Sequence, residues 1–225
     1  MSTVEQDAEV MRVLEGLTGD SSVRLKAVMA MGTSPDPRYV DRLIERCAVE
    51  PDFYVRDMLT WALTRHPAEI TVPRLVAELR SRVAQARSQA LHTLSKIGDR
   101  RAWPAITREL LTDGDDEVAR AAWRAAVVLV PENERAGLGA VLVTRLGRGG
   151  RETRLSLSRA LAALGEAVVP MLRAAAEGAD EEVRAHAIAT ERLMRDPETG
   201  FEYALEEAKR VVALGPDGEP GRQEE

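Results

Sequence analysis

The sequence predicts an all-α protein in which about six helix–turn–helix units stack as a right-handed α-solenoid. Two observations predict this class. First, an arginine that follows a small or apolar residue recurs every 30 to 34 residues, at Arg24, Arg56, Arg87, Arg120, Arg154 and Arg184. Second, small or apolar residues follow these arginines after three, six and usually seven positions, which is the spacing of one helix face. A short helical pair cannot bury such a face alone, so copies of the pair stack.

The composition agrees with a soluble helical protein. The 225 residues include 44% hydrophobic and 30% charged residues, which is ordinary for a folded chain. Leu, Ala, Glu and Arg are abundant, and these residues lose little free energy on entering a helix. We expect a single domain over residues 1–214. Residues 215–225 are rich in Gly, Pro and acidic side chains, so we expect them to form a disordered C-terminal tail.

Cysteine use and hydropathy predict a cytoplasmic protein. Cys47 is the only cysteine and is in step with Leu43 and Ile44, so we expect a buried thiol and a reducing compartment. No apolar run predicts a membrane span, and the acidic N-terminus does not resemble a signal peptide. Only three of the 31 basic residues are lysines, a bias that favours a GC-rich bacterial genome.

Each unit is expected to contain two helices. The first helices are predicted at residues 3–17, 38–49, 70–81, 101–112, 135–147 and 167–178. The second helices, which carry the recurring arginines, are predicted at residues 21–32, 53–64, 84–95, 117–128, 151–162 and 181–192. Gly and Asp mark the turns between them. A further charged helix over residues 197–215 is expected to cap the last unit.

The stretch "LSKIGDRRAWPAITRELLTDGDDEVARAAWRAA" at residues 94–126 resembles the short HEAT-like repeat of phycobilisome lyases and related proteins. The shared elements are "GD-R-A-P-I" in the first helix and "D-EV-R-A" at the start of the second. The likeness extends from the N-terminus to Leu214 and is weakest at residues 147–153, where "GRGGRET" replaces an acidic turn. The resemblance implies that the second helices line the concave side of the solenoid.

Four aspartates precede the arginine of their unit by four residues, at Asp20, Asp52, Asp116 and Asp180. An aspartate in this place is typical of a helix N-cap. We therefore interpret these aspartates and the six recurring arginines as structural. The aspartates cap the second helices, and the arginines form a ladder with carboxylates of neighbouring units.

Positions one, two, five and nine after each arginine are expected to face out of the second helix. In the second and third units they form a candidate partner-binding patch of Asp57, Met58, Trp61, Arg65, Gln89, His92 and Lys96. Aromatic residues and arginine are enriched at protein interfaces. In the fourth unit the same positions hold Ala121, Ala122, Ala125 and Leu129, whereas Trp123 falls at a core position. An alternative stays open, in which Trp61 packs between helices and His92 is an ordinary surface residue.

The charge distribution indicates the kind of partner. The net charge is −6, but residues 73–108 carry 8 basic and 2 acidic side chains. A basic middle in an acidic chain favours another protein with an acidic or anionic surface. It does not favour nucleic acid, which needs a longer positive track. We therefore predict a non-catalytic interaction or adaptor scaffold in bacterial regulation. The sensory domain of a transcription regulator is an alternative, and the oligomeric state stays open.

The sequence fits no enzyme template well. The three histidines form no metal-ligand pair, so we predict no metal and no cofactor. The HEAT-like deoxyhypusine hydroxylases bind iron through His-Glu pairs, which this chain lacks. One enzyme alternative remains. The HEAT-like alkylpurine DNA glycosylases use Trp and Asp on a basic concave face, and Asp57, Trp61 and Arg65 are similar to that set.

Overall fold

The computed structural model describes residues 3–197 and 200–214. These residues form thirteen α-helices, joined by turns and short 3-10 helices, and they contain no strand. The prediction of an all-α repeat protein is therefore confirmed. The chain divides into two compact units, Met1–Leu129 and Val130–Glu225. The tail expected to be disordered, at residues 215–225, lies outside the described residues.

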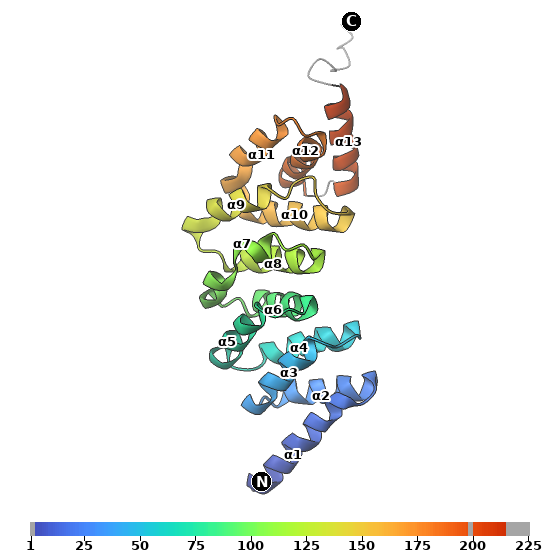
Figure 1. The fold of residues 1–225 in the computed structure, drawn as a ribbon, viewed down its shortest axis with the longest axis vertical. Coiled ribbons are helices and arrows are strands. Elements are labelled where there is room, and N and C mark those ends of the chain that lie inside the picture. Colours follow the sequence, from blue (N-terminus) through green and yellow to red (C-terminus); the bar gives the residue numbers. More distant parts are fainter. Residues whose placement is uncertain (1–2, 198–199, 215–225) are drawn as a thin grey trace, which may run out of the picture. The chain divides into compact units, whose positions relative to one another are not determined.

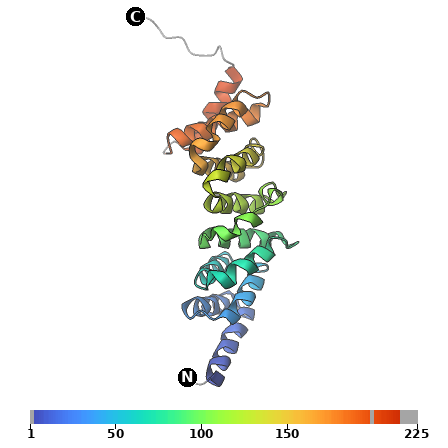
Figure 2. The ribbon, with the colours of Figure 1, turned by 90° about the vertical axis from the view of Figure 1, so that its left-hand side faces the viewer.

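The first unit is a stack of helical pairs. Its helices are α1 Thr3–Glu15, α2 Ser21–Thr33, α3 Val40–Cys47, α4 Phe53–Thr64, α5 Ala68–Glu78, α6 Ala84–Ile97, α7 Arg108–Leu111 and α8 Asp116–Leu129. The second helix of each pair packs on the second helix of the next, from α2 through α4 and α6 to α8. Both views show these four helices one above another (Figure 1, Figure 2). The first unit therefore presents one continuous layer of second helices.

The second unit continues the same pattern and ends in a capping helix. Its helices are α9 Arg135–Val143, α10 Arg151–Leu164, α11 Val169–Ala176, α12 Glu181–Arg195 and α13 Phe201–Leu214. Helix α12 packs on α10, α11 and α13. Helices α12 and α13 meet in a buried apolar cluster of Ala185, Ala189, Phe201, Ala204, Leu205 and Ala208. Helix α13 therefore occupies the place expected for the cap.

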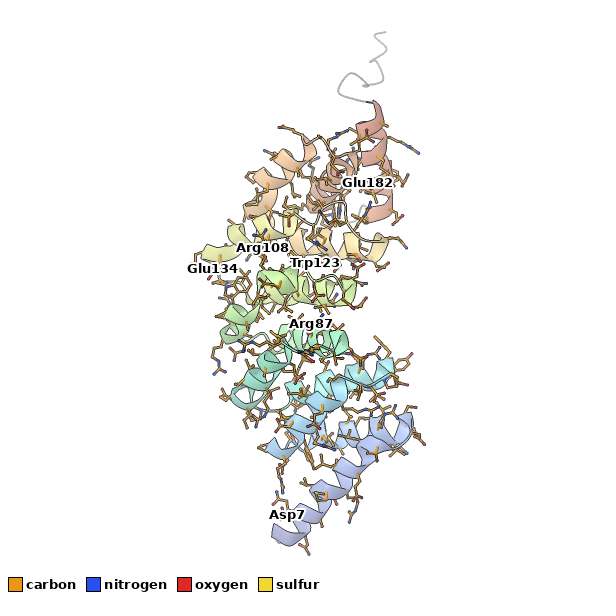
Figure 3. The ribbon with its side chains drawn as sticks, viewed as in Figure 1. Asp7, Arg87, Arg108, Trp123, Glu134 and Glu182 are labelled. Carbon is orange, nitrogen blue, oxygen red and sulfur yellow. The ribbon has the colours of Figure 1, made fainter. Side chains whose placement is uncertain are left out.

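The apolar spacing of the second helices identifies the core. The buried residues at the expected positions include Ala27, Met31, Ala90, Thr93, Leu94, Leu157, Ala160 and Leu161. Ala30 was expected among them but is exposed. Trp123 on α8, labelled in Figure 3, is only 1% exposed and belongs to the core.

The first helix of the fourth pair is broken. The sequence predicts one helix over residues 101–112, but the structure has a 3-10 helix at Arg100–Ala105 and a single α-helical turn at Arg108–Leu111. The backbone leaves the helical conformation at Ile106 and Thr107, whose ψ angles are 87° and 164°. The fourth pair is therefore the least regular one in the first unit.

The segment Arg151–Ala176 contains a window that is long and apolar enough to span a membrane, by length and composition alone. The sequence pattern was expected to contain no such run. In the structure the segment is not one straight helix, because it turns at Gly165 and forms α10 and α11. The φ of Gly165 is +65°, a conformation that glycine adopts readily. Leu157 and Leu172 of this segment are fully buried in the second unit, so its apolar residues supply core.

A buried polar network ties α10 to α12. The Nδ1 atom of His186 accepts a hydrogen bond from the N–H of Gly147 at 3.0 Å, so its Nε2 atom carries the proton. This Nε2 lies 3.1 Å from the carbonyl oxygen of Arg154 and 3.0 Å from the hydroxyl of Ser158. The Ser158 hydroxyl also lies 2.8 Å from that of Thr190. Burial lowers the pKa of His186 to about 4, so the ring is neutral at pH 7.

We expect acid to destabilise the second unit through His186. Between pH 6.5 and about 4 the unfolded chain binds a proton on this imidazole and the folded chain does not. Stability from the neutral ring is therefore fully present above pH 6.5 and is lost as the pH falls towards 4, by about 3 kcal/mol in total. An NMR titration of the His186 ring checks this. An imidazole that titrates near its ordinary pKa in the folded protein would contradict the buried network.

Candidate functional site

Aspartate caps set the start of the second helices. Asp20, Asp52 and Asp180 are the N-caps of α2, α4 and α12, and each accepts hydrogen bonds from backbone N–H groups two or three residues later. Such a cap satisfies N–H groups that have no partner within the helix, and it places negative charge at the positive end of the helix dipole. The position of the N-cap residue therefore sets the register of the helix, and with it the side chains that face outward.

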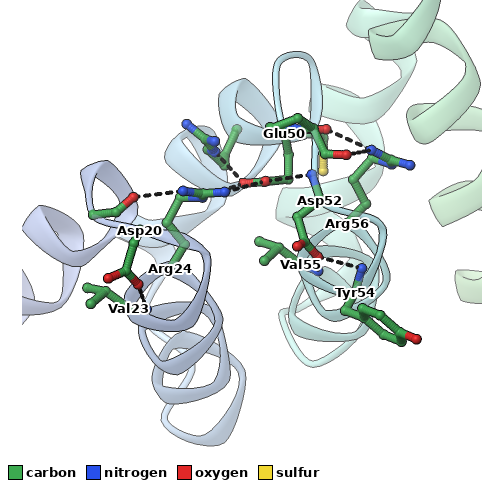
Figure 4. Close-up of polar contacts among 12 residues, drawn as sticks. Asp20, Val23, Arg24, Glu50, Asp52, Tyr54, Val55 and Arg56 are labelled. Carbon is green, nitrogen blue, oxygen red and sulfur yellow. Dashed lines mark hydrogen bonds and ion pairs between the residues drawn. The ribbon is translucent and has the colours of Figure 1, made fainter.

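Arg24 shows how a recurring arginine is engaged (Figure 4). It donates to the carbonyl oxygen of Gly19 in its own turn at 2.7 Å, and it makes two 2.8 Å hydrogen bonds to the Glu50 carboxylate in the turn of the next pair. Glu50 is fully buried and also accepts from Arg46 and from the N–H of Asp52. Burial alone would raise the pKa of Glu50. The hydrogen bonds from Arg24 and Arg46 outweigh it and hold this pKa at about 2.

Similar contacts recur in other pairs. Four further arginines donate to carbonyl oxygens five to seven residues before them: Arg56, Arg87, Arg154 and Arg184. Two of these also form ion pairs with carboxylates of the following pair, Arg87 with Asp113 and Arg154 with Glu182. These arginines hold a turn against its helix, and their guanidinium groups are occupied within the fold.

The fourth pair is out of register by one residue. The N-cap of α8 is Asp115 and not Asp116, because the Asp115 carboxylate accepts the N–H groups two and three residues later. Asp116 is instead the first residue of the helix. Ala119 therefore stands where the other units carry their arginine, since its N–H donates to the carbonyl of the capping Asp115. Arg120 is one residue further along α8, and its ion pair among the described residues is with Glu117 of its own helix, at 2.9 Å.

This shift changes which residues of α8 face outward. The four residues expected to be exposed are buried, at Ala121, Ala122, Ala125 and Leu129. Counted from Ala119, the fifth position is Arg124 and the ninth is Val128, and both are exposed. The expectation was wrong because the cap lies one residue earlier than the sequence pattern indicated. Arg124 therefore takes the place on α8 that Trp61 has on α4 and His92 has on α6.

A groove of about 470 Å³ crosses the second helices of the first unit. It is lined by Phe53, Arg56, Asp57, Ala84, Gln85, Ser88, Gln89, His92, Asp115, Glu117, Ala121 and Arg124. Four of these side chains make no hydrogen bond or ion pair within the part of the chain that the structure describes: Asp57, Gln89, His92 and Arg124. Polar groups that converge in a hollow without a partner in the fold are available to a ligand.

The structure divides the candidate patch into two groups. The groove includes Asp57, Gln89 and His92, and outside its lining lie Met58, Trp61, Arg65 and Lys96. Trp61 is 37% exposed, yet its six-membered ring lies over Gly32 of α2. A Cβ at Gly32 would come within 2.3 Å of this ring. The Trp61 side chain therefore packs against α2 while one part of it faces solvent.

The electrostatics around His92 favour a negative charge nearby. Partial burial lowers the pKa of His92, and the cations Arg124 and Lys96 lower it further, whereas Asp57 opposes them. Burial also lowers the pKa of Arg124, with a smaller contribution from Arg120. Lys96 is exposed and makes no ion pair with a described residue. A carboxylate placed between Arg124 and Lys96 would offset this repulsion.

Two features of this surface are absent from the sequence expectations. Arg124 was not expected to face outward, because the register of α8 is shifted by one residue. The adjacent Asp115 and Asp116 indicate this uncertainty in register, since either aspartate could cap the helix. Phe53 and Tyr54 at the start of α4 are 66% and 74% exposed, and their rings meet edge to face with centroids 5.7 Å apart. In the sequence these two aromatic residues directly follow the capping Asp52. They lie in the first turn of the helix, before the positions that form the core of the repeat.

The side chains of this surface are suited to polar contacts with a ligand. Among the described residues, no group of three or more His, Cys, Asp or Glu side chains is placed to hold a metal ion. Cys47 is buried, and burial raises the pKa of its thiol to about 12, so it is not a reactive thiolate. The groove offers an amide, an imidazole, a guanidinium and carboxylates, which suit hydrogen bonds and ion pairs with a partner.

Comparison with known families agrees with this fold. Residues 23–48 match the family model of the PBS lyase HEAT-like repeat. The matched segment includes most of α2 and all of α3, which are the second helix of one pair and the first helix of the next. Together with the repeated helical pairs, this match supports a HEAT-like repeat protein. Among curated proteins, none matches the chain. HEAT-like repeats generally mediate interactions between proteins.

Proposed function

We propose that this HEAT-like repeat protein is a non-catalytic interaction scaffold whose groove across α4, α6 and α8 binds a segment of another protein. The observation that carries the proposal is the convergence of four unpartnered polar side chains in that groove, Asp57, Gln89, His92 and Arg124. Such groups are costly to desolvate unless a ligand supplies their hydrogen-bond partners. A partner that pairs with them therefore gains both affinity and orientation.

The charge pattern of the surface indicates how the partner lies. Carboxylates stand in the N-terminal halves of their helices, at Asp57 and Glu117. Cations stand further along, at Lys96 and Arg124. We infer a segment that carries acidic side chains over the C-terminal halves of α6 and α8 and a basic side chain at the opposite end. The sequence predicted an acidic partner. We now propose a partner segment of mixed charge, whose acidic side chains lie next to His92.

The groove suits a protein segment better than nucleic acid. Its lining contains two arginines and three carboxylates, whereas a phosphate backbone requires a continuous positive track. The glycosylase alternative also loses support. Of the set Asp57, Trp61 and Arg65, only Asp57 lines the groove, and the Trp61 ring is engaged on Gly32.

Reversing the two cations should weaken capture of the partner without unfolding the protein. In Lys96→Glu/Arg124→Glu, acidic side chains of the partner meet carboxylates, so we expect the affinity at low salt to fall about tenfold or more. The loss should be smaller at high salt, because exposed charges are screened. The measurement is affinity capture from native lysate, followed by titration of the recovered protein against both forms. In the wild type, binding should also raise the pKa of His92, which NMR detects.

The matched control is Arg100→Glu/Arg108→Glu. Arg108 on α7 (Figure 3) and Arg100 are exposed, lie outside the groove and make no ion pair among the described residues, so the change in net charge is the same. This control should bind like the wild type. An equal loss in both variants would mean that net charge and not the groove controls binding. Recovery of nucleic acid or a small molecule in place of a protein would overturn the proposed function.

A further inference from the structure

The second unit contains a cavity of about 870 Å³ that lies among α10, α11, α12 and α13. Helix α12 packs on the other three, and the views show them as neighbours (Figure 1, Figure 2). Cavities that enclose small organic ligands measure about 300–1,000 Å³. The volume lies within this range, so it is compatible with a small organic molecule.

Part of the lining of this cavity is apolar. Phe201 of α13 is buried in the cluster that joins α12 to α13, and Leu155 of α10 packs against that cluster. Both side chains line the cavity, as do the half-buried Val169 and Met194. A hydrocarbon chain placed against them would be removed from water, at a gain of about 25 cal/mol per Å² of apolar surface.

The lining of the cavity also carries four arginines, two of which, Arg151 and Arg159, lie one turn before and one turn after Leu155 on α10. Two of its four arginines are held in ion pairs, with Glu202 and Glu191. The other two, Arg159 and Arg195, are exposed and make no side-chain hydrogen bond or ion pair within the described ranges. A guanidinium group binds a carboxylate through two parallel N–H donors, so these two arginines are suited to an acidic head group.

The charge of the lining favours a ligand with one negative charge. Four arginines face three glutamates, Glu166, Glu191 and Glu202, which leaves one net positive charge. A single carboxylate balances it, whereas a phosphate monoester carries about −1.5 to −2 and would face the glutamates with excess charge. We propose that this cavity binds an apolar monocarboxylate, with its chain on Leu155 and Phe201 and its carboxylate at Arg159 and Arg195.

This site is independent of the interaction groove. Every residue that lines the cavity belongs to the unit Val130–Glu225, and every residue that lines the groove belongs to the unit Met1–Leu129. Variants of one site leave the other unchanged, so a failure of the carboxylate site does not bear on the proposed scaffold function. The reverse also holds.

Titration calorimetry with decanoate tests the proposal. We expect saturable binding to the full chain with a Kd below about 1 mM, and at least tenfold weaker binding to Arg159→Gln/Arg195→Gln. Decanol has the same chain without the charge, and decyl phosphate has a larger charge, so both should bind more weakly than decanoate. Ala162→Phe, which places a large side chain at the cavity wall, should also block binding while circular dichroism shows the helices retained.

The matched control is Arg148→Gln/Arg210→Gln, which removes two exposed arginines of the same unit that do not line the cavity. It should bind decanoate like the wild type. Equal affinity for decanoate and decanol, or an unchanged affinity in Arg159→Gln/Arg195→Gln, would show hydrophobic adsorption and overturn the proposal. Absence of saturable binding up to about 1 mM decanoate would overturn it as well.

Discussion

Replacing Glu50 with glutamine should lower the free energy of unfolding by about 3–5 kcal/mol, because it breaks a buried ion pair by removing one partner. The Glu50 side chain is fully buried, and those of Arg24 and Arg46 are only 12% and 22% exposed. Glutamine keeps the shape of the side chain and removes the charge, so two guanidinium groups remain partly buried without an anion. Urea denaturation followed by far-ultraviolet circular dichroism measures the loss.

Glu45→Gln is the matched control for this prediction. Glu45 pairs with Arg42 on the surface of α3, and the two side chains are 62% and 54% exposed. Exposed pairs of this kind contribute about 0–1 kcal/mol, so the control should be nearly neutral. If Glu50→Gln and Glu45→Gln destabilise the protein equally, the Arg24–Glu50 contact does not hold the first two pairs together.

Replacing Trp123 with alanine should cost about 3–5 kcal/mol, because it leaves a large cavity in the core of the first unit. The indole is 1% exposed, and its Nε1 donates to the carbonyl oxygen of Leu111 at 2.8 Å. Leu111 is the last residue of the single turn α7, and its carbonyl lies beyond those that the N–H of Thr112 satisfies, at Arg108, Glu109 and Leu110. Trp123 therefore fills space and also satisfies the broken first helix of its pair. Equilibrium unfolding in urea checks the loss.

Two further variants separate these contributions. Trp123→Phe retains most of the ring and removes the N–H donor, so we expect an intermediate loss of about 1–3 kcal/mol for the unsatisfied Leu111 carbonyl together with the smaller ring. Trp61→Ala removes a ring that is 37% exposed and should cost less than Trp123→Ala. A larger loss for Trp61→Ala than for Trp123→Ala would contradict the burial that distinguishes them.

Much of the scaffold could be predicted because its signals are local. An aspartate cap, an arginine four residues later and apolar residues at helical spacing lie within one turn or two of each other, as at Asp20, Arg24 and Ala27. The carboxylate that Arg24 binds could not be identified in this way, since Glu50 is 26 residues away.

The candidate site was harder to predict because it depends on register. Asp57, Gln89 and His92 were correctly placed near one another only because the second and third units keep their arginine at the same distance from the helix start. The doubled aspartate before α8 offers two caps, and the choice of Asp115 rotates every following side chain by one position. A shift of one residue in a helix turns a side chain by about 100°, enough to bury Ala125 and expose Arg124.

The all-α class, the repeat length, the second helices and, except in α8, most of the apolar face that each one buries can be predicted from the sequence. These follow from periodicity, which is a property of neighbouring residues. Three features depend on how the helices pack: Trp61 packs on Gly32, Arg124 and His92 line one groove, and Arg159 and Arg195 line a cavity in the second unit. The physical reason is that each of these contacts joins residues about 30 or more positions apart, and their geometry depends on how one helix packs on the next.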